Sequence, residues 1–146
     1  MKLFIDANVL VCVLNKELPR FPDAARVLSL AHQKIGKKQS QQIFLFTTPL
    51  CLAIAFYFAS KKHGEAVAKK KIDLLVPHMG IAVIDENSVR KAMNDKRVVD
   101  VEDGFQYYAA LKAGCDRIIT YNVPDFYFSE IPVMQPEELL YVLKEL

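Results

Sequence analysis

The chain has 146 residues, of which 52% are hydrophobic and 25% charged, so its composition is that of a globular domain and excludes a disordered or collagen-like chain. Three cysteines without a CxxC pair and three histidines without HExxH spacing exclude a disulfide framework and argue against a zinc module. A chain of this length buries enough surface to fold as one unit, and we expect a single domain over residues 1–146.

The formal net charge of +2 hides an uneven distribution of charge along the chain. Residues 1–73 contain 12 Lys and Arg against 5 Asp and Glu, whereas residues 74–146 contain 7 against 12. This asymmetry is compatible with a surface that binds a polyanion while carboxylates gather elsewhere. It is equally compatible with two solvated faces of an ordinary enzyme.

The first third of the chain predicts a strand and two helices. Residues 2–5 read as an apolar strand that ends at Asp6, and residues 7–15 as an apolar helix capped by Asp6 or Asn8. A second helix begins at Phe21-Pro22-Asp23 and, from the spacing of its apolar residues, stops around Gly36. The polar residues 37–42 are expected to form a loop.

Residues 39–60 contain no charge, a length that would suffice for a membrane span. The sequence Thr47-Thr48-Pro49 interrupts this run, and the residues before it are aromatic and β-branched, as in buried strands. We therefore expect a strand over residues 43–47 and a helix from Pro49 rather than a membrane span. The N-terminus has Asp6 within its apolar stretch and does not resemble a signal peptide, so we expect a cytoplasmic protein with reduced thiols.

The rest of the chain alternates strands and helices. A basic helical segment covers residues 61–71, a short strand residues 80–84, and a short helix residues 85–93. A helix over residues 101–113 ends at Gly114, strands follow at 117–121 and 131–134, and Pro136 opens a last helix. This alternation predicts an α/β fold, a three-layer α/β/α sandwich around a mostly parallel sheet.

Acidic and amide side chains follow the predicted strands. In open α/β sheets ligands bind at the carboxyl ends of the strands, and because several carboxylates repel each other, such a cluster favours a hard divalent cation such as Mg²⁺ or Mn²⁺. A cation of this kind activates water and polarises phosphate, which points to phosphodiester hydrolysis. The candidate residues are Asp6, Asp100, Glu102, Asp103, Asn122 and Asp125.

Each of these residues also has a purely structural interpretation. Asp6 is suited to cap the helix that follows it, and acids from Asp100 to Asp103 are favourable at a helix N-terminus. Asn122 and Asp125 are common turn formers. Their joint placement at strand ends, rather than any single residue, favours the functional interpretation.

Three segments carry a resemblance to a known family: LFIDANVLV, VEDGFQYYAALKAGCDRIITYNVPDF and IPVMQPEELL. They resemble the PIN-domain family, especially its toxin-like VapC-type bacterial members, over nearly the whole chain. The resemblance implies an endoribonuclease whose Asp6, Asp103 and Asp125 are catalytic and hold Mg²⁺ or Mn²⁺, with Asn8, Thr120 and Asn122 in supporting positions. It also implies an RNA substrate, an antitoxin protein as partner, and a homodimer.

The chain departs from the family pattern in one place. The family places a glutamate in the helix after the second strand, but residues 49–57 contain no acid. Either Asp100 or Glu102 takes its place, or the site holds one metal ion, or activity is reduced or absent. The alternative function is thus a catalytically impaired PIN-like domain that binds RNA or protein.

Two further interpretations concern the basic segment and Asp6. Lysines that neutralise phosphates bind RNA without reading its sequence, although such a run also suits a solvated helix face. Asp6 could alternatively be a phosphoryl-transfer nucleophile, but the second aspartate that such phosphatases place two residues on is replaced by Asn8. The candidate RNA-binding residues are Lys61, Lys62, Lys69, Lys70 and Lys71.

Overall fold

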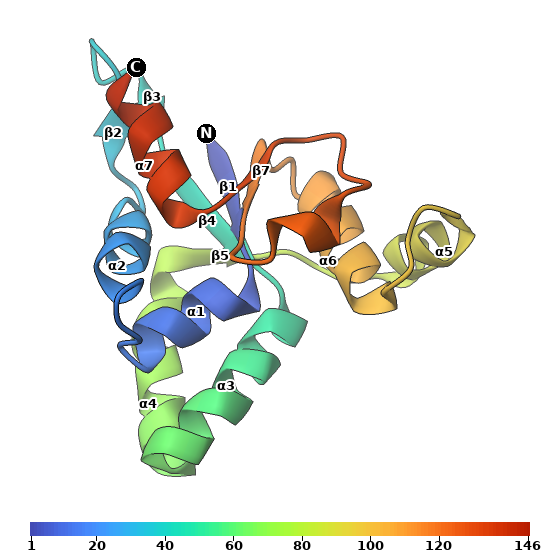
Figure 1. Ribbon diagram of the computed structural model, residues 1–146, viewed down its shortest axis with the longest axis horizontal. Coiled ribbons are helices and arrows are strands. Elements are labelled where there is room, and N and C mark those ends of the chain that lie inside the picture. The colour runs from blue at the N-terminus through green and yellow to red at the C-terminus, as the bar shows by residue number, and fades with distance from the viewer.

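The computed structural model describes residues 1–146 and is built around a parallel sheet of five strands in the order β5-β4-β1-β6-β7 (Figure 1). Every neighbouring pair in this sheet is parallel, so the predicted α/β class is confirmed. The strands are β1 (Lys2–Ile5), β4 (Phe44–Thr47), β5 (Met79–Ile81), β6 (Arg117–Ile119) and β7 (Val133–Met134).

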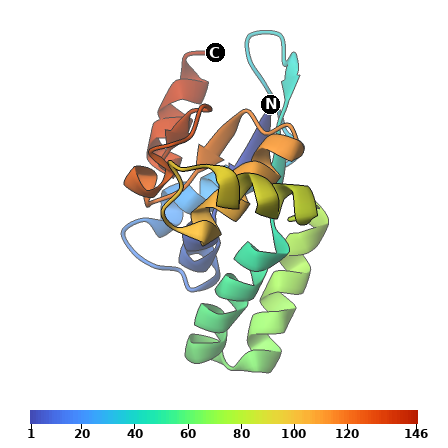
Figure 2. The same cartoon turned by 90° about the vertical axis from the view of Figure 1, so that its right-hand side faces the viewer.

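Helices cover both faces of the sheet, as a three-layer sandwich requires. Helices α1, α2 and α7 lie on one face and α5 and α6 on the other, while α3 and α4 form an antiparallel pair that projects from the body of the molecule (Figures 1 and 2). The helices are α1 (Ala7–Leu14), α2 (Phe21–Ser29), α3 (Pro49–His63), α4 (Glu65–Leu75), α5 (Glu86–Asn94), α6 (Val101–Lys112) and α7 (Pro136–Lys144), with short 3-10 turns η1 (Val76–His78) and η2 (Val123–Phe126).

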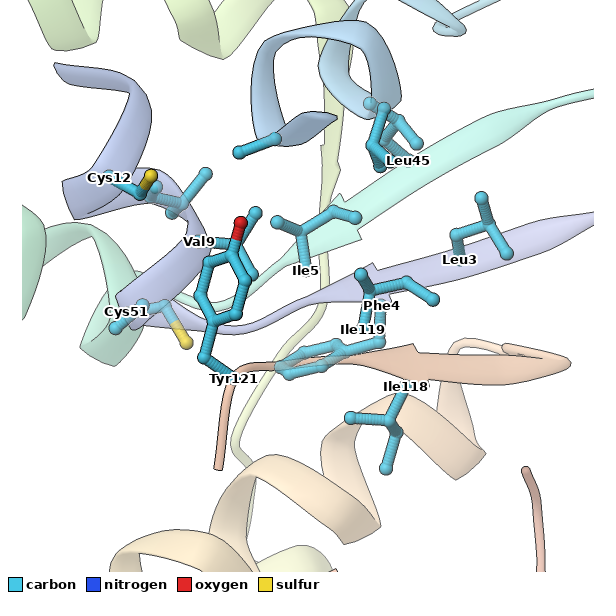
Figure 3. Packing of buried hydrophobic residues seen from close by; sticks show 14 of the residues in the cluster. Leu3, Phe4, Ile5, Val9, Cys12, Leu45, Cys51, Ile118, Ile119 and Tyr121 are labelled. Atoms are coloured by element: carbon cyan, nitrogen blue, oxygen red, sulfur yellow. The ribbon is translucent and has the colours of Figure 1, made fainter. Parts of the chain in front are cut away.

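Strand β1 is the centre of the core. Its residues Leu3, Phe4 and Ile5 are fully buried, because successive side chains point to opposite faces and both faces are covered by helices. Figure 3 shows them packed with Leu45 of β4 and Ile118 of β6. A continuous apolar strand is therefore stable only in this central position.

The order of the strands places a crevice between β1 and β6. From β1 the chain passes through α1 and α2 to β4 on one side, and only after α5 and α6 does it return to pair β6 with the other side of β1. Such a reversal of direction separates the loops at the carboxyl ends of the two strands. The residues after Ile5 and Ile119 therefore face a shared opening.

Several element boundaries differ from the sequence-based expectation. The second helix ends at Ser29, not near Gly36, because Lys34–Ile35 and Gln41–Gln42 pair as a small antiparallel hairpin (β2 and β3). The prediction of a loop over residues 37–42 is thus wrong for Gln41–Gln42, which form β3. Strand β5 starts at Met79 and pairs for only three residues, because its partner β4 ends at Thr47, opposite Ile81, where the chain turns into α3.

The charge-free segment divides as expected. Its strand is β4, and the Thr48 side chain accepts a hydrogen bond from the Cys51 backbone N–H (3.1 Å) at the start of α3. Such a cap satisfies one of the open donors at a helix N-terminus. None of the helices is both long and apolar enough to cross a membrane.

Candidate active site

A cavity of about 440 Å³ opens at the carboxyl ends of β1 and β6. Residues from four separate segments line it, and Arg20 is the one Lys or Arg among them. The structure therefore brings together the acids that the sequence analysis selected, and adds Glu17 to them. The six carboxylates that line the cavity are Asp6, Glu17, Asp100, Glu102, Asp103 and Asp125.

Asp6 both caps a helix and faces the cavity. Its Oδ1 accepts the Ala7 backbone N–H (2.8 Å), and its Oδ2 accepts the hydroxyl of Thr120 (2.8 Å) and the amide of Asn8 (3.3 Å). Burial raises the pKa of the Asp6 carboxyl, and the hydrogen bonds from Thr120, Ala7 and Cys51 act in the opposite direction. The capping role expected from the sequence is confirmed, and it holds this carboxylate at the cavity.

Thr120 connects the ends of the two central strands. Its buried hydroxyl donates to Asp6 and accepts both the amide of Asn8 (3.0 Å) and the backbone N–H of Asn122 (3.0 Å). Asn8 completes the connection by accepting the Tyr121 backbone N–H at 3.0 Å. Thr120 itself lies behind Asp6 and does not line the cavity, whereas Asn8 and Asn122 do.

The start of α6 supplies three acids. Asp100 caps this helix by accepting the Glu102 backbone N–H at 2.9 Å, as its structural interpretation predicts, and both residues are exposed. Asp103 is half-buried, and its burial together with the nearby Asp100, Asp125, Asp6 and Glu102 raises its pKa to about 7. The predicted charge repulsion within the cluster is thus present.

Asp125 reaches the cavity from η2. The turn is closed by a hydrogen bond from the Asp125 backbone N–H to the carbonyl of Asn122 (3.0 Å), so both residues are turn formers here. The side chains of both also line the cavity. The charge of Asp125 contributes to the raised pKa values of Asp6 and Asp103.

The donor set fits a hard divalent cation. All ion pairs within 4.0 Å lie elsewhere, namely Glu86–Arg90, Asp95–Arg97, Glu130–Arg97 and Asp85–Lys112, so no basic side chain neutralises the carboxylates of the cavity. No three His, Cys, Asp or Glu side chains already stand in a metal-holding arrangement. Carboxylate and amide oxygens are nevertheless the ligands that Mg²⁺ and Mn²⁺ prefer, and a cation would relieve the repulsion at Asp103.

Helix α3 forms an apolar part of the same cavity. It contributes Ile54 and Phe58 and no acid, so this wall of the cavity is hydrocarbon. Cys51 lies one turn earlier, with its sulfur 3.8 Å from the Asp6 Oδ1. The spacing of these residues along the helix, 51, 54 and 58, was the signal that could have placed them on one face.

None of the five predicted RNA-binding lysines lines the cavity. Lys62 and Lys71 donate to the backbone carbonyls of Asn15 (2.6 Å) and Leu14 (3.1 Å), which lie at the C-terminal end of α1. The Lys61 ammonium lies 4.3 Å from the centre of the Tyr57 ring, and Lys69 and Lys70 are exposed. Two of the five therefore already donate hydrogen bonds within the protein, and a third lies over an aromatic ring.

The fold and the site define a parallel α/β domain with a carboxylate cluster at the point where the strand order reverses. Residues 2–124 match the family model described as PIN domain. The chain belongs to the PIN domain family, and the resemblance inferred from the sequence is confirmed.

Individual relatives have diverged far in sequence. The chain is 27% identical over 141 residues to Ribonuclease VapC1 of Aquifex aeolicus (strain VF5), covering 94% of this chain and 92% of that protein. It is also similar in structure to VapBC-1 from nontypeable Haemophilus influenzae (TM-score 0.68, 15% identity, 94% of this chain and 99% of that one). It is also similar in structure to VapC20 of Mycobacterium tuberculosis, described as a Sarcin-Ricin loop cleaving toxin. The TM-score is 0.59 and the identity 13%, over 80% of this chain and 86% of that one.

Proposed function

We propose that the protein is a metal-dependent endoribonuclease that hydrolyses RNA phosphodiester bonds, and that it is the toxin of a toxin–antitoxin pair. The observation that carries this proposal is the cluster of carboxylates that three separate elements bring to one cavity without a basic partner. The names of the relatives, a ribonuclease and a loop-cleaving toxin, support it.

Asp6, Asp103 and Asp125 are the residues proposed to hold Mg²⁺ or Mn²⁺. When bound, such an ion lowers the pKa of a coordinated water and polarises a phosphate. Thr120 and Asn8 orient the Asp6 carboxylate through their hydrogen bonds. Asp100 and Glu102, which line the same cavity, stand in for the acid that α3 lacks.

The protonation of Asp103 makes the site sensitive to pH. With a pKa near 7, this carboxyl binds and releases a proton in the neutral range when no cation compensates its neighbours. It lies in the first turn of α6 and is half-buried. The charge of Asp103 therefore depends on what else occupies the cavity.

The partners follow from the same proposal. The exposed lysines of α3 and α4, Lys61, Lys69 and Lys70, together with Lys62 and Lys71, are proposed to contact RNA phosphates beyond the cavity. An antitoxin protein is the proposed partner, because structural relatives include toxin–antitoxin complexes. We also propose that the protein forms a homodimer and acts in the cytoplasm.

The test is a calorimetric titration of Mn²⁺ into the wild type and into Asp6→Asn and Asp103→Asn. Asp73→Asn, which removes an exposed acid of α4, is the matched control. We expect saturable binding in the wild type and the control, and its loss in both cavity variants. Metal-stimulated RNA cleavage should disappear in the same two variants, whereas Mn²⁺ binding that both variants retain would contradict the assignment.

A second function is favoured by one observation, the apolar α3 side of the cavity. A domain that lost an acid there could bind RNA or a protein without cutting. In that case the wild type would bind RNA but not cleave it with any divalent cation, and Asp103→Asn would bind equally well. Cleavage by the wild type would exclude this alternative.

A further inference from the structure

Arg20 occupies an unusual place in the acidic cavity. It is the one basic residue in the lining, it is exposed, and no carboxylate lies within 4.0 Å of its guanidinium. Instead the guanidinium lies 4.4 Å from the centre of the Tyr121 ring. A cation–π contact of this kind positions the group while leaving its N–H donors available.

The Tyr121 ring ties Arg20 to the framework that holds the acids. Tyr121 is buried, follows Thr120 directly, and donates its backbone N–H to Asn8. Its hydroxyl donates to the carbonyl of Arg20 at 3.4 Å. The position of the guanidinium is thereby linked to the same residues that orient Asp6.

Phe58 is the aromatic residue of this cavity that solvent reaches. This α3 residue is 46% exposed although its side chain is apolar. The Tyr57 ring packs edge-on against it, with 5.2 Å between the two ring centres. The amide of Asn15 donates to the Phe58 carbonyl at 3.5 Å, which connects this turn of α3 to the end of α1. An exposed ring beside charged groups is unexplained by packing alone.

We propose that Arg20 and Phe58 form a subsite for one nucleotide of single-stranded RNA, in which Arg20 binds a phosphate and Phe58 stacks on the base. The subsite rests on the proposed function in taking RNA as the ligand. A guanidinium presents paired donors that match phosphate oxygens, and an aromatic ring accepts any base because every base has a π face. Bases in a duplex are already stacked, so the subsite selects unpaired nucleotides.

The experiment measures anisotropy of a fluorescent random-sequence RNA of 12 nucleotides, with Ca²⁺ present to neutralise the acids. Arg20→Ala is compared with Arg26→Ala, which removes an arginine that lies outside the cavity. We expect only Arg20→Ala to reduce the slope of log affinity against log salt, by about 0.7 for one lost phosphate contact. Arg20→Lys should keep the slope, because it keeps the charge.

Phe58→Leu is compared with Tyr141→Leu, which removes an exposed aromatic residue of α7 that does not line the cavity. We expect Phe58→Leu to weaken single-stranded RNA binding at least about fivefold without changing the salt slope, because stacking is not an ionic contact. Tyr141→Leu should bind like the wild type. Thermal unfolding of each variant separates loss of the subsite from loss of the fold.

The outcomes separate the subsite from the proposed function. A wild type that binds RNA in Ca²⁺ but never cleaves it in Mn²⁺ would contradict the nuclease and leave the subsite standing. Cleavage by the wild type, with the cavity variants Arg20→Ala and Phe58→Leu binding RNA as tightly as their controls, would overturn the subsite alone. Absence of RNA binding, or equal affinity for a 12-base-pair duplex, would overturn it as well.

Discussion

Two sides of one cavity differ sharply in chemistry. The ends of β1 and β6 and the start of α6 present carboxylates held by backbone and hydroxyl donors, whereas α3 presents Ile54 and Phe58. The acidic side consists of loops and helix N-termini, where polar groups are needed to satisfy the backbone in any case. On the α3 side the residues lie in the body of a helix, where the backbone makes no such demand.

The fold places different demands on the two sides of the cavity. Asp6 and Asp100 each cap a helix, so replacing either affects stability as well as any ligand. A residue in the middle of α3 that faces the cavity has no capping role, and an acid can be exchanged for isoleucine there without disturbing the backbone. Two acids of the acidic side thus also serve the fold, whereas the α3 residues that face the cavity have no capping role.

The largest expected effect is on Mn²⁺ affinity, and it comes from giving the α3 side a carboxylate like those of the acidic side. Ile54→Glu places a carboxylate on the α3 side, and we expect it to tighten Mn²⁺ binding about 10- to 100-fold, the range over which single groups at metal sites act. Ile54→Gln is the control, because it matches the side chain in size but adds no charge. Calorimetry that finds equal Mn²⁺ affinity for both variants would show that this position does not face the metal.

The second prediction concerns the support of the acidic side. Thr120→Val removes the hydroxyl that donates to Asp6 and accepts the Asn122 N–H, and leaving these buried groups unpaired should lower the free energy of unfolding by about 2 kcal/mol. Thr120→Ser keeps the hydroxyl and should lose less. Urea denaturation gives both values, and the interpretation is wrong if the serine variant is the less stable of the two.

The third prediction is a pH dependence of the metal-free protein. The pKa of Asp103 is raised from 3.8 to about 7, so between these values the folded state binds more protons than the unfolded state. Stability should therefore fall as pH rises through this window, by on the order of 1 kcal/mol after discounting for solvent screening. Urea denaturation in EDTA at pH 5 to 8 measures this.

The control for the pH dependence is again a pair of variants. Asp103→Asn should lose this part of the slope, because the amide does not titrate. Asp73→Asn, far from the cavity, should keep it. Saturating Mn²⁺ should abolish or reverse the dependence in the wild type, since protons then compete with the metal.

The smallest expected effects distinguish the lysines of α3 and α4. Lys62→Met and Lys71→Met remove donors to the carbonyls of Asn15 and Leu14, and each should lower the free energy of unfolding by about 0.5 kcal/mol. Lys70→Met should leave stability unchanged, because Lys70 is exposed. If Lys70 contacts RNA phosphate, its variant should instead reduce the salt slope of RNA binding.

Much of the acidic side could be predicted from the sequence because its signals are local. Asp6 directly follows an apolar strand, and Asp100 to Asp103 form the cap and first turn of a helix, so cap and strand-end positions are visible without a structure. The left-handed turn at Gly114 (φ +78°), which ends α6, was visible in the same way. Parallel pairing of the strands then placed these residues at one edge.

The β2–β3 hairpin could not be predicted in this way. Its strands, Lys34–Ile35 and Gln41–Gln42, are two residues each, too short to show a period of two. Their pairing comes from backbone hydrogen bonds, such as the Ile43 N–H to the Gln33 carbonyl (2.8 Å). Neither the polar side chains nor the hydrophobicity pattern of these residues predicts a hairpin.

The sequence by itself determined the parallel α/β architecture, the acids at the strand ends and the absence of an acid in residues 49–57, because each depends on hydrophobic runs and on neighbours in the chain. Tertiary structure alone decided that Arg20 and Phe58 enter the acidic cavity, and that Lys62 and Lys71 bind carbonyls of α1. The physical reason is that these contacts depend on how helices pack across the sheet, and long exposed side chains carry no periodic signal of the partner they will meet.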